Sequence, residues 1–141
     1  MSTVSAVVRL LREQLDPREA TVRESPGAIV TIDAPSGSSG CSIEIRLLAA
    51  AEVEVAFHVP SRQGSPFEQL LVGPPQDADA VIREAVALAC DLVAERKVVA
   101  WERRWPGGGR KFLEAADLGP GVLKELKWVR SWRGTHDWDA A

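Results

Sequence analysis

Two neighbouring segments in which apolar and polar residues alternate constrain the fold of this chain most strongly. Every second residue is apolar across residues 41–47, and the pattern repeats across residues 53–59. Because successive side chains of a β-strand point to opposite faces of a sheet, each segment predicts a strand with one buried face. The short run Ala49-Ala50-Ala51 joins them. The sequence therefore predicts a hairpin at this point, and with it an antiparallel sheet.

Two other segments have the apolar spacing of an amphipathic helix. Valines and leucines recur at intervals of three or four residues from Val4 to Leu15, and Pro17 stops the pattern. From Asp77 to Arg96 a broad stripe of Ala, Val, Ile and Leu lies opposite charged residues. The sequence therefore predicts an N-terminal helix and a longer central helix.

Further short segments with strand character precede and follow the central helix, divided by Gly, Pro and Ser: residues 20–24, 28–34, 67–72, 98–105, 110–115 and 127–133. We expect a single α+β domain over residues 1–141, with an antiparallel sheet of about six strands and both helices packed on one face. Residues 134–141 are predicted to form a loose, loop-like tail. This element order, without a shared motif, resembles that of small bacterial secretion chaperones and of several toxin-neutralising immunity proteins.

Composition places the chain among ordinary globular proteins. Of its 141 residues, 45% are hydrophobic and 26% are charged. No run reaches the ~18 apolar residues that cross a bilayer, and the N-terminus lacks the pattern of a secretory signal. We therefore expect a cytoplasmic protein without a membrane segment. The abundance of Arg, Ala, Gly and Pro is typical of GC-rich codons, which favours a bacterial source.

Residues with the chemistry of a metal or cofactor site are few and far apart. Cys41 and Cys90 do not form a CxxC pair, and His58 and His136 have no ligand partner at a zinc-site spacing. The glycine-rich stretch 106–111 lacks the phosphate-loop pattern. We expect no metal and no cofactor.

The pattern Trp-x-Arg-x-Trp occurs twice, at residues 101–105 and 128–132, in a chain with five Trp and no Tyr. On a strand, the two rings and the arginine of each copy share a face, and the guanidinium lies between the rings in cation–π geometry. Were residues 127–133 helical, the arginine would point away. Trp and Arg are enriched at binding hot spots, although the same rings could be core residues covered by arginine stems. The candidate partner-binding residues are Trp101, Arg103, Trp105, Trp128, Arg130 and Trp132.

The distribution of charge indicates what kind of partner would bind. Residues 1–97 carry a net charge of −5 and residues 98–141 a net charge of +2. The acidic part would complement a basic protein. The sequence thus predicts a non-enzymatic protein-binding domain with an immunity-type or chaperone-like role. The acidic pI of about 5.4 and the lack of a nucleic-acid-binding motif argue against nucleic acid.

An alternative function uses the same region of the chain. In it, the protein binds or transforms a small anionic ligand, with Arg103 and Arg130 as the clamp and His136 as a proton carrier. Self-association into a homodimer through an exposed strand is compatible with either function.

Overall fold

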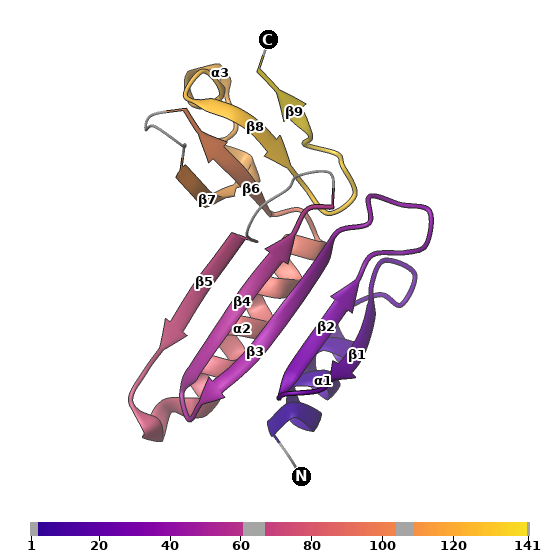
Figure 1. The fold of residues 1–141 in the computed structure, drawn as a ribbon, viewed down its shortest axis with the longest axis vertical. Helices are drawn as coiled ribbons and strands as arrows, with labels where there is room; N and C mark the ends of the chain where they lie inside the picture. The colour runs from indigo at the N-terminus through magenta and orange to yellow at the C-terminus, as the bar shows by residue number, and fades with distance from the viewer. Residues whose placement is uncertain (1–2, 61–66, 104–108, 141) are drawn as a thin grey trace. The chain divides into compact units, whose positions relative to one another are not determined.

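The computed structural model describes residues 3–60, 67–103 and 109–140 (Figure 1). Its antiparallel strands and helices confirm the predicted α+β class. Within the described ranges the strands form two sheets, of five and of four strands, where one sheet of about six was expected. The difference arises because the strands that follow the central helix pair with one another. Two compact units result, Met1–Cys90 and Asp91–Ala141.

The first unit contains one sheet and two helices. Its five strands pair in the order in which they follow one another along the chain, and the predicted hairpin is confirmed as the β3–β4 pair. The elements are α1 (Thr3–Gln14), β1 (Thr21–Ser25), β2 (Ile29–Asp33), β3 (Ser42–Ala49), β4 (Glu52–His58), β5 (Phe67–Val72), the 3-10 helix η1 (Pro75–Asp77) and α2 (Ala78–Val93), whose last turn belongs to the second unit.

The core of the first unit lies between the sheet and the helices. Figure 1 shows α1 and α2 behind the sheet, and one face of each strand supplies the buried side chains. Val30, Ile43 and Val55, from three adjacent strands, have no exposed surface, and Leu11 of α1 is equally buried. The apolar side chains at every second position of the strands therefore pack against the apolar face of α1 and form one buried layer. Among the described residues of the first unit, no helix lies on the opposite face of the sheet.

The second unit is built on the four-stranded sheet, in the order β7-β6-β8-β9. Its elements are β6 (Lys97–Glu102), β7 (Gly109–Glu114), the 3-10 helix η2 (Ala115–Asp117), α3 (Pro120–Leu123), β8 (Leu126–Arg130) and β9 (Trp138–Asp139). Val98, Ala100, Leu126 and Val129 form its buried cluster. The expectation of a loop over residues 134–141 is wrong at β9, because Trp138 pairs with Val129 and packs on this cluster.

None of the helices in the described ranges combines the length and the apolar character needed to cross a lipid bilayer.

Candidate functional site

The tryptophans of the two repeated patterns meet across the second sheet. Trp101 of β6 lies directly opposite Trp128 of β8, and their ring centroids are 6.1 Å apart at an interplanar angle of 28°. Because residues 126–130 form a strand, Arg130 shares a face with Trp128, and its Cζ lies 5.5 Å from the centroid of that ring. The predicted strand geometry is confirmed for these residues.

Sequence reasoning missed a second arginine in this row. Arg110 of β7 lies opposite Trp101, with its Cζ 5.1 Å from the ring centroid. The stacked pair Trp101 and Trp128 therefore has one arginine against each ring, Arg110 at Trp101 and Arg130 at Trp128, in cation–π contact. Arg110 could have been predicted from the register of the β6–β7 hairpin, because that register determines which residue lies opposite Trp101.

Arg130 uses its guanidinium to hold the C-terminal strand. Its Nη1 donates to the carbonyl oxygens of Val129, at 2.7 Å, and Trp138, at 3.2 Å. Its Nη2 donates to both carboxylate oxygens of Asp139, at 2.9 and 3.1 Å, and the side chain is 12% exposed. An external anion would have to displace these contacts. Arg130 thus attaches β9 to β8.

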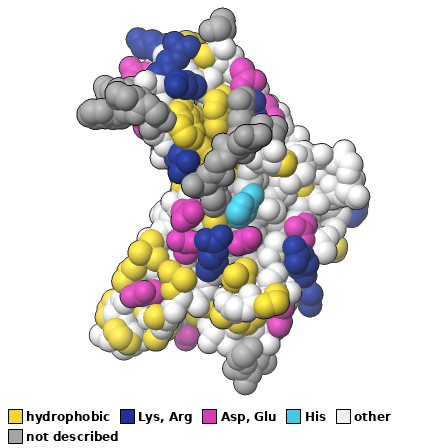
Figure 2. Space-filling model, in the orientation of Figure 1, with side chains coloured by type: hydrophobic (Ala, Val, Ile, Leu, Met, Phe, Trp, Pro, Cys, Tyr) yellow, Lys and Arg dark blue, Asp and Glu magenta, His cyan; other side chains and the backbone are white. Residues whose placement is uncertain are grey.

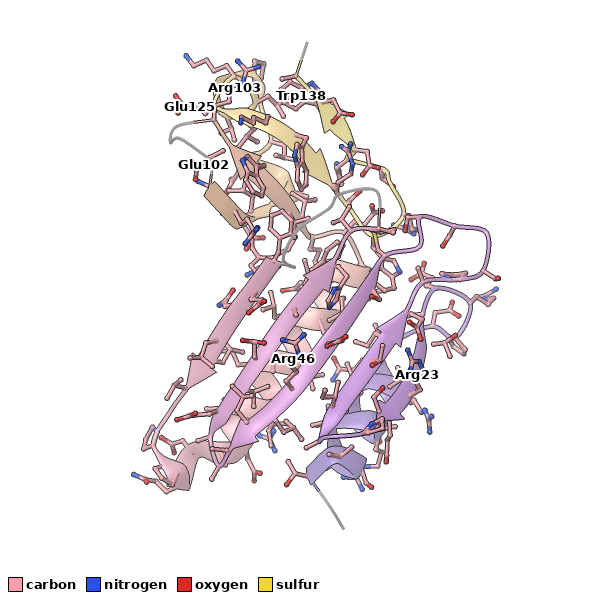
Figure 3. All side chains as sticks on the ribbon, in the orientation of Figure 1. Arg23, Arg46, Glu102, Arg103, Glu125 and Trp138 are labelled. Carbon is pink, nitrogen blue, oxygen red and sulfur yellow. The ribbon has the colours of Figure 1, made fainter. Side chains whose placement is uncertain are left out.

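The other candidate residues, Trp132, Arg103 and Trp105, are not part of this group of stacked rings and arginines. Trp132 is 1% exposed and lies beyond the end of β8, so the expectation that it shares a strand face with Trp128 and Arg130 is wrong. The strand ends before it because the backbone turns at Ser131, whose carbonyl accepts from Gly134. Arg103 is exposed just after β6, and its backbone nitrogen donates to the carbonyl of Glu125 (Figure 3). Trp105 lies outside the described residues.

A buried carboxylate organises the segment that follows Trp132. Glu95 is 5% exposed and has a φ of 59°. It accepts hydrogen bonds from the backbone nitrogen and Nε of Arg133, at 3.2 and 2.8 Å, and from the backbone nitrogen and Oγ1 of Thr135, at 3.2 and 2.7 Å. Burial raises the pKa of Glu95, but hydrogen bonds from Ser131, Thr135 and Arg133 outweigh it and lower the pKa from 4.5 to about 2.

His136 lies within this same segment, where its backbone nitrogen donates to Ser131 Oγ at 2.9 Å. The anion-binding alternative also requires Arg130, whose hydrogen bonds are made within the protein. In residues 3–60, 67–103 and 109–140, no three His, Cys, Asp or Glu side chains gather as a metal-binding group.

A pocket of about 590 Å³ lies in the first unit, between the N-terminal parts of its two helices and the β3–β4 turn. Alanines at 49, 50, 51 and 78 form much of its wall, and Asp79 is the charged residue among its lining. An apolar wall with one carboxylate does not suit an anionic ligand.

The open sheet face, which we define as the face of β1–β5 opposite the two helices, concentrates charge (Figure 2). The alternation of the strands places more carboxylates than arginines on it. The carboxylates are Asp33, Glu44, Glu52, Glu54 and Glu68, and the arginines are Arg23 and Arg46. Arg23 Nε pairs with Asp33 Oδ2 at 2.7 Å. In the described part of the chain, Glu52 and Glu68 form no ion pair. The face is therefore acidic.

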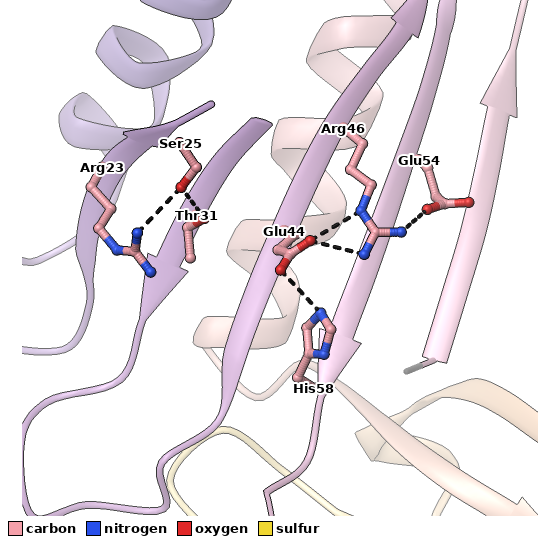
Figure 4. A network of polar contacts seen from close by, with 7 residues as sticks. All are labelled: Arg23, Ser25, Thr31, Glu44, Arg46, Glu54 and His58. Carbon is pink, nitrogen blue, oxygen red and sulfur yellow. Dashed lines mark hydrogen bonds and ion pairs between the residues drawn. The ribbon is translucent and has the colours of Figure 1, made fainter. Parts of the chain in front are cut away.

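Arg46 lies near the middle of the open sheet face, between two carboxylates (Figures 3 and 4). Its Nε and Nη2 donate to Glu44 Oε2 at 3.0 and 2.9 Å, and its Nη1 donates to Glu54 Oε1 at 2.6 Å. The hydrogen bond with Glu44, and then that with Glu54, raises the pKa of Arg46. His58 Nε2 lies 3.5 Å from Glu44 Oε1, and it has no hydrogen-bond partner among the described residues. One arginine thus serves two carboxylates, which leaves an excess of negative charge.

Large apolar side chains are exposed at one end of the same face. Leu48 is 54% exposed, Leu70 is 55% exposed and Val72 is 60% exposed. Leu70 lies opposite Glu54, and Val72 lies opposite Glu52. Figure 2 shows hydrophobic side chains gathered over β5 with acidic side chains beside them. The open sheet face therefore combines exposed apolar surface with negative charge.

No protein-family model, curated protein or solved structure matches this chain.

Proposed function

We propose that this protein is a non-enzymatic binding protein, and that the open sheet face receives a partner protein rich in basic and apolar side chains. The observation that carries the proposal is the exposure of Leu70 and Val72 beside Glu52 and Glu54. Apolar side chains left in water forfeit roughly 25 cal/mol for each Å² that a partner could cover. Neighbouring carboxylates would select a basic partner and speed its association.

An immunity-type or chaperone-like role is the specific form of this proposal. Both roles need a surface that recognises another protein and require no chemistry from the binding protein itself. The open sheet face meets that need with side chains held on a paired sheet, so little conformational entropy is lost on binding. Trp101 and Arg103 stay candidate contacts for a partner, whereas Trp128, Arg130 and Trp132 serve the packing of the second unit.

The test is binding of the natural partner, identified by affinity capture, to two charge-reversed variants. The first carries Glu52→Lys and Glu68→Lys on the open sheet face. The matched control carries Glu13→Lys and Glu84→Lys, which are exposed on the two helices. We expect the first variant to lose at least about tenfold in affinity, or 1.4 kcal/mol, and the control to bind like the wild type.

Equal binding by both variants would contradict the proposed surface. Loss of binding on Trp101→Ala together with Arg103→Ala, with the open-face variant unaffected, would assign the partner to the second unit instead. Circular dichroism of each variant establishes that the fold is retained.

A further inference from the structure

The two edges of the five-stranded sheet differ in how they are protected. At the β1 edge, Arg12 of α1 donates from Nη2 to the carbonyl oxygen of Val22 at 3.0 Å. Charged Arg23 and Glu24 also lie in this five-residue strand. Charged side chains are one of the means by which proteins keep sheet edges from pairing with other chains, and the bond from Arg12 occupies a backbone acceptor of β1. The β1 edge is protected in this way.

The β5 edge has no comparable protection. All six residues of β5 pair with β4, from Phe67 opposite Phe57 to Val72 opposite Glu52. An antiparallel strand directs half of its backbone N–H and C=O groups to each side, so the outer groups of residues 68–72 face away from β4. No backbone hydrogen bond from a described loop reaches these residues. The strand contains no proline and a single charged residue, Glu68.

From this contrast we propose that an extended segment of the partner adds to β5 as a further antiparallel strand, and that on the open sheet face it presents two apolar residues and one basic residue at every second position. The inference rests on the proposed function and specifies how the partner binds. Strand addition supplies backbone hydrogen bonds for affinity, and the alternating side chains supply selectivity.

The side chains of β5 define the chemistry of the added strand. Glu68, Leu70 and Val72 point to the open sheet face, and Leu71 points into the core. Side chains directly opposite each other on paired strands interact. A lysine or arginine therefore fits beside Glu68, and apolar side chains fit beside Leu70 and Val72. Glu54 on the next strand adds a second carboxylate near the same positions.

A second copy of this chain fits the β5 edge less well. If two β5 strands paired symmetrically about Leu70, each Glu68 would lie opposite a Val72 rather than a cation. Two acidic sheet faces would also be joined, and like charges brought together weaken association. The charge pattern thus favours a basic partner over self-pairing.

The experiment uses the full chain and a designed probe, the peptide acetyl-Thr-Val-Thr-Ile-Thr-Lys-Lys-amide, whose Val, Ile and first Lys share one face and would lie opposite Val72, Leu70 and Glu68. Amide hydrogen exchange is followed by NMR with and without saturating peptide. We expect exchange to slow by at least about tenfold at those amides of residues 68–72 that point away from β4. The control peptide has the same side chains but is N-methylated at the alternate residues whose N–H groups would face β5, so that edge cannot pair with β5. We expect it to give no protection.

A matched pair of variants locates the binding. Leu70→Lys and Leu48→Lys replace equally exposed leucines, and only the first lies on β5. We expect Leu70→Lys to weaken peptide binding at least about tenfold and Leu48→Lys to weaken it much less.

Three results would overturn strand addition. Equal protection by the N-methylated peptide, with equal losses from both leucine variants, would leave the open sheet face as a binding surface without a new strand. Absence of peptide binding at millimolar concentration would also overturn strand addition. The proposed function is tested separately, and it would fail only if the Glu52→Lys, Glu68→Lys variant bound the natural partner normally. Concentration-dependent protection of β5 without peptide would assign the edge to a second copy.

Discussion

At the scale of single residues, Glu95 is the side chain whose chemistry depends most on its surroundings. A buried carboxylate is costly unless hydrogen bonds compensate for its lost hydration. Here Arg133 and Thr135 supply backbone and side-chain donors. The carboxylate thereby determines the path of residues 131–135, which follow β8.

The lowered pKa of Glu95 predicts acid sensitivity. Because the folded-state pKa is about 2 and the ordinary value is 4.5, the stabilisation is fully present above about pH 4.5 and is lost as the pH falls toward 2. The shift corresponds to at most about 3 kcal/mol. We expect Glu95→Gln to lower the free energy of unfolding by about 2–4 kcal/mol at pH 7 and to flatten this pH dependence. Urea unfolding between pH 2 and 7 measures both effects.

The control for Glu95 is Glu125→Gln, since Glu125 is exposed and its side chain makes no hydrogen bond within the described residues. Its stability should stay within about 0.5 kcal/mol of the wild type. Equal losses from both variants would show that the Glu95 hydrogen bonds contribute no specific stability.

The different burial of Trp132 and Trp101 predicts that replacing each by alanine destabilises the protein to a different extent. Trp132 is 1% exposed, so Trp132→Ala should leave a large cavity and cost about 3–5 kcal/mol. Trp101 is half-buried, and we expect Trp101→Ala to cost clearly less. Thermal unfolding followed by circular dichroism compares the two. Similar stability of both variants would contradict the assignment of Trp132 to the core.

At the scale of elements, β5 separates a core-facing side from an exposed side within one strand. Leu71 is 6% exposed, whereas its neighbour Leu70 is 55% exposed. Alternation along the strand produces this difference from two identical residue types. The same strand can therefore contribute to stability with one face and remain available for binding with the other.

Threonine substitutions in β5 test this division, because threonine keeps strand propensity while removing apolar surface. We expect Leu71→Thr to lower the free energy of unfolding by about 2–4 kcal/mol and Leu70→Thr to change it by less than about 0.5 kcal/mol. Chemical denaturation of both variants provides the measurement. A large loss from Leu70→Thr would mean that its exposed side chain is needed for the fold, which would weaken its assignment to a partner.

At the scale of the whole molecule, the division into two units coincides with the division of charge. Residues 1–90 carry a net charge of −5, and residues 91–141 a net charge of +2. All four lysines lie in the second unit, whereas the positive charges of the first unit at neutral pH are on arginines. The acidic unit is the one with the open sheet face, and this is why we place the proposed basic partner there.

The prediction of one domain over residues 1–141 is open to a calorimetric test. A single cooperative domain unfolds in one transition, with a calorimetric enthalpy equal to the van't Hoff enthalpy. We expect that equality for the full chain at neutral pH. Two resolved transitions, or a calorimetric enthalpy well above the van't Hoff value, would show that the two compact units unfold separately.

The sequence by itself determined the local elements of this protein. The hairpin of β3 and β4 and the two main helices follow from apolar periodicity, which is a property of neighbouring residues. The strand that aligns Trp128 with Arg130 was favoured over a helix by its β-branched and aromatic residues. The charge asymmetry was equally visible in the sequence.

Only the tertiary structure decided which strands share a sheet, which rings are buried and which edge is left open. Glu95 bonds to residues 38 and 40 positions away, and Arg130 holds a strand that the local sequence suggested was a loop. Strand pairing and hydrogen bonds of this kind join residues that are distant in the chain, so no local pattern encodes them. For the same reason, the sequence indicated the tryptophans as the candidate site, whereas the structure indicates the open sheet face. The exposure of a residue depends on what packs against it in the fold, and not on its neighbours in sequence.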